Sequence, residues 1–153
     1  MKILSILTEK RKIGNLGEKE AVKYLRINGY KILEKNYVSQ NAEIDIIASN
    51  KNVTAFIEVK TRNVKGLGTK QDRPASAVTP EKQRKIIKVA NHYINRCKPK
   101  TRLRLDVIEV YVEDDAKKGV KVKEIKHIES AFDLNTAFDL KYAYKRQKEG
   151  SNL

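Results

Sequence analysis

The chain has very little cysteine and histidine. Of its 153 residues one is a cysteine, Cys97, and two are histidines, His92 and His127. A single cysteine excludes an internal disulfide and every zinc module that is built on several cysteines. Two histidines argue against a histidine-rich metal site. The scarcity of cysteine and histidine therefore argues against most sites built on several thiols or on zinc.

Long apolar runs are also missing. No stretch approaches the roughly 18 consecutive apolar residues of a membrane-spanning helix. The first twelve residues offer only four large apolar side chains before charges begin, and Ser5 interrupts them, so they do not resemble a secretion signal. We therefore expect a soluble, cytoplasmic protein with no membrane partner.

The chain has fewer acidic residues than basic ones. The chain has 33 Lys and Arg against 19 Asp and Glu, a net charge of +14, and its pI is about 9.8. This excess is larger than solubility alone requires in a small domain, and it predicts a polyanionic partner such as nucleic acid. Residues 60–104 hold 14 of the basic residues and only two acidic ones, so most of the excess lies in under a third of the chain.

The hydrophobic pattern predicts one α/β domain over residues 14–132, with a basic lead-in over 1–13 and a charged tail over 133–153. Helices are expected over 14–28 and from Pro80, capped by Thr79, to about Arg96. Residues 63–78 lack periodicity and are expected to form a loop. Strands are expected over 30–38, 42–48, 53–61, 102–112 and 120–128, with a short helix after Ser130. This order predicts a mixed five-stranded sheet flanked by helices.

The second and third expected strands form a hairpin that carries two carboxylates on one face. Asp45 lies on the second strand, and Glu58 and Lys60 share a face of the third. A turn centred between Lys51 and Asn52 puts Asp45 directly opposite Glu58, and a turn one residue earlier makes them diagonal neighbours. Opposed residues have Cβ atoms roughly 5 Å apart, so the two carboxylates converge in either register.

Like charges across a strand pair destabilise it, so something must offset this pair. Mg²⁺ or Mn²⁺ would do so, because both prefer hard oxygen ligands. A raised pKa on one carboxyl group, an ion pair with Lys60, and a solvent-exposed ladder of salt bridges are the alternatives.

Glu18 adds a third carboxylate. Its spacing places it on the apolar face of the helix expected over 14–28, where it can point at the sheet. Taken alone, Glu18 is better explained as an exposed acid in the first turn of the helix, where it benefits from the helix dipole.

Several motifs occur together over residues 14–132. They are Gly14-Asn-Leu-Gly17-Glu18, Glu43-Ile44-Asp45, Phe56-Ile57-Glu58-Val59-Lys60-Thr61-Arg62 and Asp106-Val107-Ile108. In this combination they resemble the YraN family of small bacterial proteins, which is related to the PD-(D/E)xK nuclease superfamily. The order of the acids is also similar to that of archaeal Holliday-junction resolvases. Two features depart from the pattern: the superfamily's proline near the aspartate is absent, and Ala42 replaces the usual glycine before Glu43.

The resemblance implies a restriction-endonuclease-like core and a role for each matching residue. Asp45 and Glu58 would hold Mg²⁺, or Mn²⁺ as a substitute, with help from the Val59 carbonyl. Lys60 would orient or activate water and stabilise the charge that develops on phosphorus. Glu18 would complete the catalytic set, directly or through water. In the basic stretch, the candidate contacts to nucleic acid are Arg62, Lys65, Lys70, Arg73 and Lys82.

The function expected from these residues is Mg²⁺-dependent endonucleolytic hydrolysis of phosphodiester bonds in DNA, including branched or damaged DNA. One alternative is a nucleic-acid-binding protein with a nuclease-like fold and little or no catalysis. Another is an interaction protein whose basic surface docks an acidic partner. If the chain cuts two strands, as a junction resolvase does, a two-fold homodimer is expected.

Overall fold

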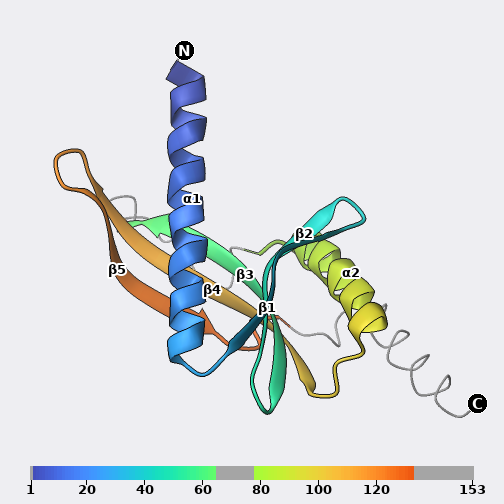
Figure 1. Ribbon diagram of the computed structural model, residues 1–153. Helices are drawn as coiled ribbons and strands as arrows, with labels where there is room; N and C mark the ends of the chain where they lie inside the picture. The colour runs from blue at the N-terminus through green and yellow to red at the C-terminus, as the bar shows by residue number, and fades with distance from the viewer. Residues whose placement is uncertain (1, 65–77, 133–153) are drawn as a thin grey trace, which may run out of the picture.

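The computed structural model describes residues 2–64 and 78–132. The elements are α1 (Lys2–Ile27), β1 (Lys31–Ser39), β2 (Ala42–Ser49), β3 (Val53–Asn63), α2 (Pro80–Cys97), β4 (Arg102–Asp115) and β5 (Gly119–Ile128). The strands form one sheet in the order β1-β2-β3-β4-β5 (Figure 1). Only the central β3–β4 pair is parallel, and the other neighbours are antiparallel. The mixed five-stranded sheet is thus confirmed, and it is consistent with a restriction-endonuclease-like core.

The two helices pack on opposite faces of the sheet. α2 connects the parallel strands β3 and β4, and a crossover of this kind is what parallel pairing requires. Thr79 caps α2 as expected, because its hydroxyl accepts a hydrogen bond from the Lys82 backbone N–H at 3.2 Å. The core beneath α2 is built around Phe56, Ile86, Ala90 and Leu105, and the core beneath α1 around Ala21, Leu25, Ile57 and Ile108.

α1 begins earlier than the sequence predicted. It starts at Lys2 rather than near Gly14, so the expected lead-in is helical. Residues 2–12 are exposed, and the large apolar side chains among them are 55–74% exposed: Ile3, Leu4, Ile6 and Leu7. Figure 1 shows these turns extending past the sheet. No glycine or proline interrupts residues 2–13, so the helix propagates outward from its packed half.

The packed half of α1 lies very close to β3. A Cβ atom on Gly17 would stand only 1.9 Å from Thr61 Oγ1. The absence of a side chain at Gly17 therefore lets the helix approach the sheet, and this approach positions the next residue, Glu18.

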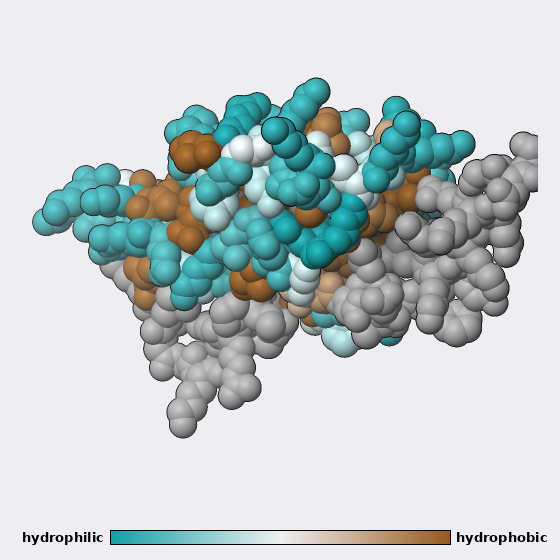
Figure 2. All heavy atoms as spheres, turned by 90° about the horizontal axis from the view of Figure 1, so that it is seen from below, coloured by the Kyte–Doolittle hydropathy of each residue, from teal (hydrophilic) through white to brown (hydrophobic). Residues whose placement is uncertain are grey.

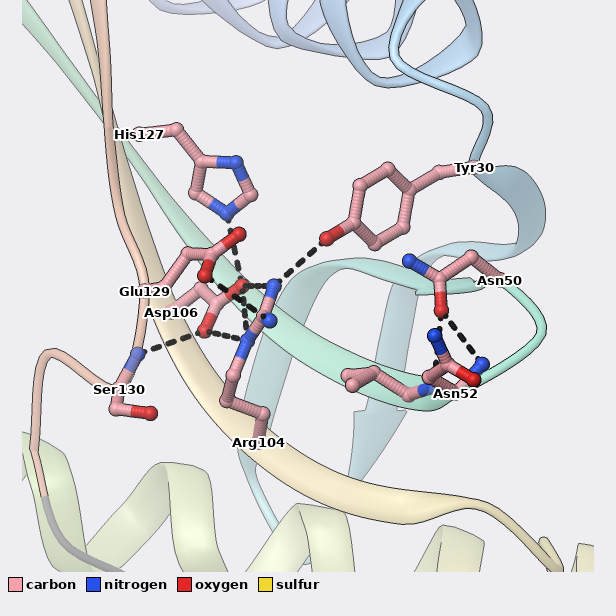
Figure 3. Close-up of polar contacts among 9 residues, drawn as sticks. Tyr30, Asn50, Asn52, Arg104, Asp106, His127, Glu129 and Ser130 are labelled. Atoms are coloured by element: carbon pink, nitrogen blue, oxygen red, sulfur yellow. Dashed lines mark hydrogen bonds and ion pairs between the residues drawn. The ribbon is translucent and has the colours of Figure 1, made fainter.

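A buried polar cluster joins β4 to the end of β5 (Figure 3). Arg104 Nη2 donates to Asp106 Oδ2 and to the Tyr30 hydroxyl, at 2.8 and 2.7 Å. His127 Nε2 lies 2.8 Å from Asp106 Oδ2, and the Ser130 backbone N–H donates to Oδ1 at 3.0 Å. Burial alone would raise the pKa of Asp106, but these hydrogen bonds outweigh it and hold that pKa below its ordinary value. The cluster thus links β4 to the start of β1 and the end of β5.

Hydrophilic side chains cover most of the described surface in Figure 2, and apolar ones occur there in small separate patches. Within residues 2–64 and 78–132, no helix is both long and apolar enough to cross a membrane. Most of the loop expected over 63–78 and of the helix expected after Ser130 lies outside the described residues. The division into lead-in, domain and tail stays a prediction.

Candidate active site

Strands β2 and β3 separate at the two carboxylates of the hairpin, Asp45 and Glu58, and we call this point the fork. The ladder between β2 and β3 runs from Ser49 opposite Thr54 to Ile46 opposite Ile57, which is the register of the predicted turn between Lys51 and Asn52. Asp45 and Glu58 come next along their strands. Beyond them β2 stays paired with β1 while β3 stays paired with β4, so the two strands part.

Asp45 and Glu58 are both buried at this fork, with exposed fractions of 8% and 5%. Asp45 Oδ2 accepts a hydrogen bond from the Val59 backbone N–H at 2.8 Å. Burial and the neighbouring Glu58 together raise the pKa of Asp45 to about 7, against an ordinary value of 3.8. The pair is therefore no exposed salt-bridge ladder, and a raised pKa offsets part of its repulsion.

Two ammonium groups offset the remaining repulsion between Asp45 and Glu58 by pairing with Glu58. Its Oε1 lies 2.5 Å from Lys82 Nζ and 3.4 Å from Lys60 Nζ. Burial would lower the pKa of Lys82, but the hydrogen bond and charge of Glu58 outweigh it and raise that pKa. Lys82, expected as a phosphate contact, thus reaches into the acidic site from α2.

Glu18 faces the same fork from α1. Its side chain is half-buried and accepts a hydrogen bond from Asn36. Burial, with the charges of Glu43 and Glu58, raises its pKa. Asn36 has a φ of 49°, a left-handed conformation that asparagine tolerates better than most residues. The inward direction of Glu18, one of two alternatives in the sequence, is the one observed.

Two hollows open onto Asp45. The one beneath α1 has a volume of about 340 Å³ and includes Glu18, Lys19, Lys23, Arg26, Lys35 and Asn36 in its wall. The one beside α2 has a volume of about 350 Å³ and includes Glu43, Glu58, Glu81, Lys82 and Lys85. Each combines an acidic interior with basic side chains, so a phosphate group has a route to the carboxylates from either side.

Of the other expected contacts to nucleic acid, the structure describes only Arg62. Arg62 lies two residues beyond Lys60 on β3, beside Tyr111 of β4. Lys65, Lys70 and Arg73 lie outside the described residues. Their role in binding nucleic acid stays a prediction.

Sequence reasoning missed Glu109. It lies directly beside Lys60 on the adjacent strand and is 1% exposed. One carboxylate oxygen accepts a hydrogen bond from the Tyr111 hydroxyl, and the other, Oε1, has no hydrogen-bond partner in the described part of the chain. No local pattern marks this residue, because its position beside Lys60 depends on parallel pairing between distant strands. It adds another carboxylate next to the site lysine.

Sequence reasoning also missed the cations of α1 and β1 that line the first hollow. Lys19, Lys23 and Arg26 repeat at intervals of four and three, which places them on one side of a helix. That spacing is a signal the sequence contains, but a count of charge along the chain does not reveal it.

Comparisons with known proteins agree with the resemblance drawn from the motifs. The model of the family described as "Uncharacterised protein family UPF0102" matches residues 17–110. A UPF0102 protein of Caldanaerobacter subterraneus is 42% identical over 124 residues, which is 80% of this chain and 96% of that protein. One of Chlorobium phaeobacteroides is 40% identical over 121 residues, covering 78% of this chain and 93% of that protein. UPF0102 is the YraN family. By sequence and by family model, the chain belongs to the UPF0102 family.

Proposed function

We propose that this protein is a Mg²⁺-dependent endonuclease that hydrolyses phosphodiester bonds in DNA. The observation that carries the proposal is the fork, where β2 and β3 part and leave Asp45 and Glu58 buried side by side with Lys60 adjacent. Two buried carboxylates and an amine in a hollow with basic walls form a set suited to a metal and a phosphate rather than to a packed core.

The donor chemistry of the fork fits a hard divalent cation. Mg²⁺ takes oxygen ligands, usually one or two carboxylates, and keeps several waters. Asp45, Glu58 and the Val59 carbonyl would supply the protein oxygens. Within the described ranges no three acidic, histidine or cysteine side chains form a ready metal cluster, so water would complete the coordination. Such an ion would supply Lewis acidity and an activated water for hydrolysis.

The residues around the fork take separate roles in this proposal. Lys60 lies one step from Glu58 on the same face of β3 and would stabilise negative charge that develops on the phosphate oxygens. Glu18, on the α1 side, would orient the attacking water. Lys82 would leave Glu58 when the cation binds, and its ammonium would then be free to contact a phosphate.

A nucleic-acid-binding protein with little or no catalysis is the second candidate. It is favoured by one observation, the pairing of both Lys60 and Lys82 with a single oxygen of Glu58. In that arrangement the ammonium groups already neutralise Glu58, and a metal ion has to compete with them.

Cleavage assays test the proposal and separate the two candidates. The wild type is incubated with linear, nicked, flapped and four-way DNA and with RNA, each with Mg²⁺, with Mn²⁺ or with EDTA. We expect metal-dependent cleavage of at least one DNA substrate. Asp45→Asn and Lys60→Ala should each lower the rate about 100-fold or more, because each removes a group that acts on the reacting phosphate.

The matched control is Glu124→Gln, which removes an exposed acid on β5 that lines neither hollow. It should cleave like the wild type. DNA that the wild type binds but leaves intact in every metal condition would support the non-catalytic candidate instead. An assembly that cuts two strands needs two active sites, one from each protomer. A homodimer therefore remains part of the proposal.

A further inference from the structure

α1 carries a row of cations that the proposed chemistry does not use. Lys12, Lys19, Lys23 and Arg26 recur at intervals of seven, four and three residues, so they share one side of the helix. The side that packs on the sheet is a different one, formed by Gly17, Ala21, Val22 and Leu25. Lys19, Lys23 and Arg26 are exposed. The row is therefore accessible along the outside of the helix.

The row borders the hollow that leads to Asp45. Lys19, Lys23 and Arg26 line it from α1, and Lys35 lines it from β1 on the other side. Glu18 and Asp45 form its acidic interior. The basic side chains of α2 belong to the second hollow. Cations therefore flank the fork on two sides, and those of α1 approach it from the face opposite α2.

Two cations of the row make exposed ion pairs with glutamates, and the first is Lys12, whose Nζ lies 3.2 Å from Glu9 Oε1. Lys23 Nζ lies 3.4 Å from Glu20 Oε1 in a solvent-exposed pair, and such pairs are weak. Lys19 and Arg26 make no ion pair with a carboxylate of the described residues. Weakly paired cations on successive turns of one helix favour a ligand that carries regularly spaced negative charge, which is the character of a nucleic-acid backbone.

An anionic membrane surface fits this row less well. A helix that binds a membrane surface places an apolar face beside its basic one. Of the apolar side chains near Lys19 and Lys23, Ala21, Val22 and Leu25 are buried against the sheet, and Ile27 is exposed. The other large exposed apolar side chains of α1 lie in its first two turns, at the opposite end of the helix from Lys19, Lys23 and Arg26. The row therefore has one exposed isoleucine beside it rather than an apolar face. The ligand has to be recognised by charge, at the mouth of a hollow.

We propose that Lys19, Lys23 and Arg26 of α1, together with Lys35 of β1, bind the phosphate backbone of nucleic acid on the side of the fork opposite α2. The proposal rests on the proposed function for the identity of its ligand and deepens it by naming a second phosphate-binding subsite. Nucleic acid bound there continues past Asp45 toward Lys82 and Lys85, so both hollows hold parts of one ligand.

Binding measurements at several salt concentrations test this subsite. The variant is the triple substitution Lys19→Gln, Lys23→Gln and Arg26→Gln. The matched control removes the same charge from the β4–β5 hairpin, through Lys117→Gln, Lys118→Gln and Lys121→Gln, which are exposed and line neither hollow. Fluorescently labelled duplex and four-way DNA are titrated in EDTA, so that no cleavage occurs, and circular dichroism verifies the fold of each variant.

Each phosphate contact contributes about 0.9 to the slope of log affinity against log salt on duplex DNA. We expect the slope of the α1 variant to fall by about 2 to 3, with weaker binding, and the slope of the hairpin control to stay near the wild-type value. Equal slopes for the two variants, or a wild type that binds no nucleic acid, would overturn the subsite. Binding to phosphatidylserine vesicles is measured in parallel. An α1 variant that loses vesicle binding while it retains wild-type DNA binding would also overturn the subsite. A salt slope that falls in the α1 variant but not in the hairpin control, together with a wild type that cleaves nothing, would contradict the proposed catalysis but support the subsite.

Discussion

At the scale of single residues, Asp45 is the most perturbed group of the fork. Burial and the nearby Glu58 raise its pKa to about 7, while the Val59 N–H supplies only part of the compensation that a buried carboxylate needs. The native state therefore holds a proton on Asp45 over a pH range in which the unfolded chain has lost it. An ionised Asp45 costs the folded molecule stability until a cation or another donor compensates for it.

Asp45→Asn should consequently change how stability depends on pH. Because the native pKa lies above the unfolded value of 3.8, the wild type binds more protons when folded, and its free energy of unfolding falls as pH rises from about 4 to about 7. The variant lacks this fall. Without divalent cations it should match the wild type near pH 4 and exceed it by on the order of 2 to 4 kcal/mol above pH 7.

Urea denaturation between pH 4 and pH 8.5 measures this difference, with Glu124→Gln as the exposed-acid control. A constant gap between Asp45→Asn and wild type across that range would contradict the pKa assigned to Asp45.

At the scale of elements, the placement of α1 depends on one residue without a side chain. Gly17 allows the helix to lie against Thr61 of β3, and this contact brings Glu18 to the fork. A methyl group at this position would have to displace either the threonine or the helix. The site therefore depends on a packing contact that is not itself part of the chemistry.

Gly17→Ala should destabilise the protein by about 1 to 3 kcal/mol, the usual cost of overpacking, although alanine is the better helix former by about 1 kcal/mol. It should also lower the rate of any cleavage, because Glu18 moves away from Asp45. Gly14→Ala is the matched control on the same helix, since nothing lies within 4 Å of a Cβ there, and it should raise stability slightly. Thermal unfolding of both variants provides the measurement. Equal melting temperatures would argue against the close approach at Gly17.

Elements also differ in how well the sequence predicted them. The hairpin register followed from local turn residues and strand alternation, so the meeting of Asp45 and Glu58 was predicted correctly. The start of α1 was not, because residues 2–12 are exposed and leave no core periodicity to detect. The neighbour relation of Lys60 and Glu109 arises from the parallel pairing of β3 with β4, which turn chemistry does not encode.

At the scale of the whole molecule, folding gathers basic residues from two separate parts of the sequence around Asp45. The basic stretch over 60–104 supplies Lys60, Lys82 and Lys85, but the cations of α1 precede it by more than thirty residues. Folding brings Lys82 and Lys85 to one hollow beside Asp45 and the cations of α1 to another, while Lys60 pairs with Glu58. Counting charges along the sequence identified only the basic residues of 60–104. The position of the α1 cations was missed, because it depends on how α1 packs on the sheet.

The most direct test of the account is the location of a divalent cation in crystals soaked with Mn²⁺ near pH 8. At this pH Asp45 is mostly ionised, since its pKa is about 7. The account predicts an anomalous-scattering peak bonded to one carboxylate oxygen of Asp45 and one of Glu58, with Lys82 Nζ displaced from Glu58. Crystals that show Mn²⁺ at other carboxylates while Glu58 keeps its pair with Lys82 would contradict it.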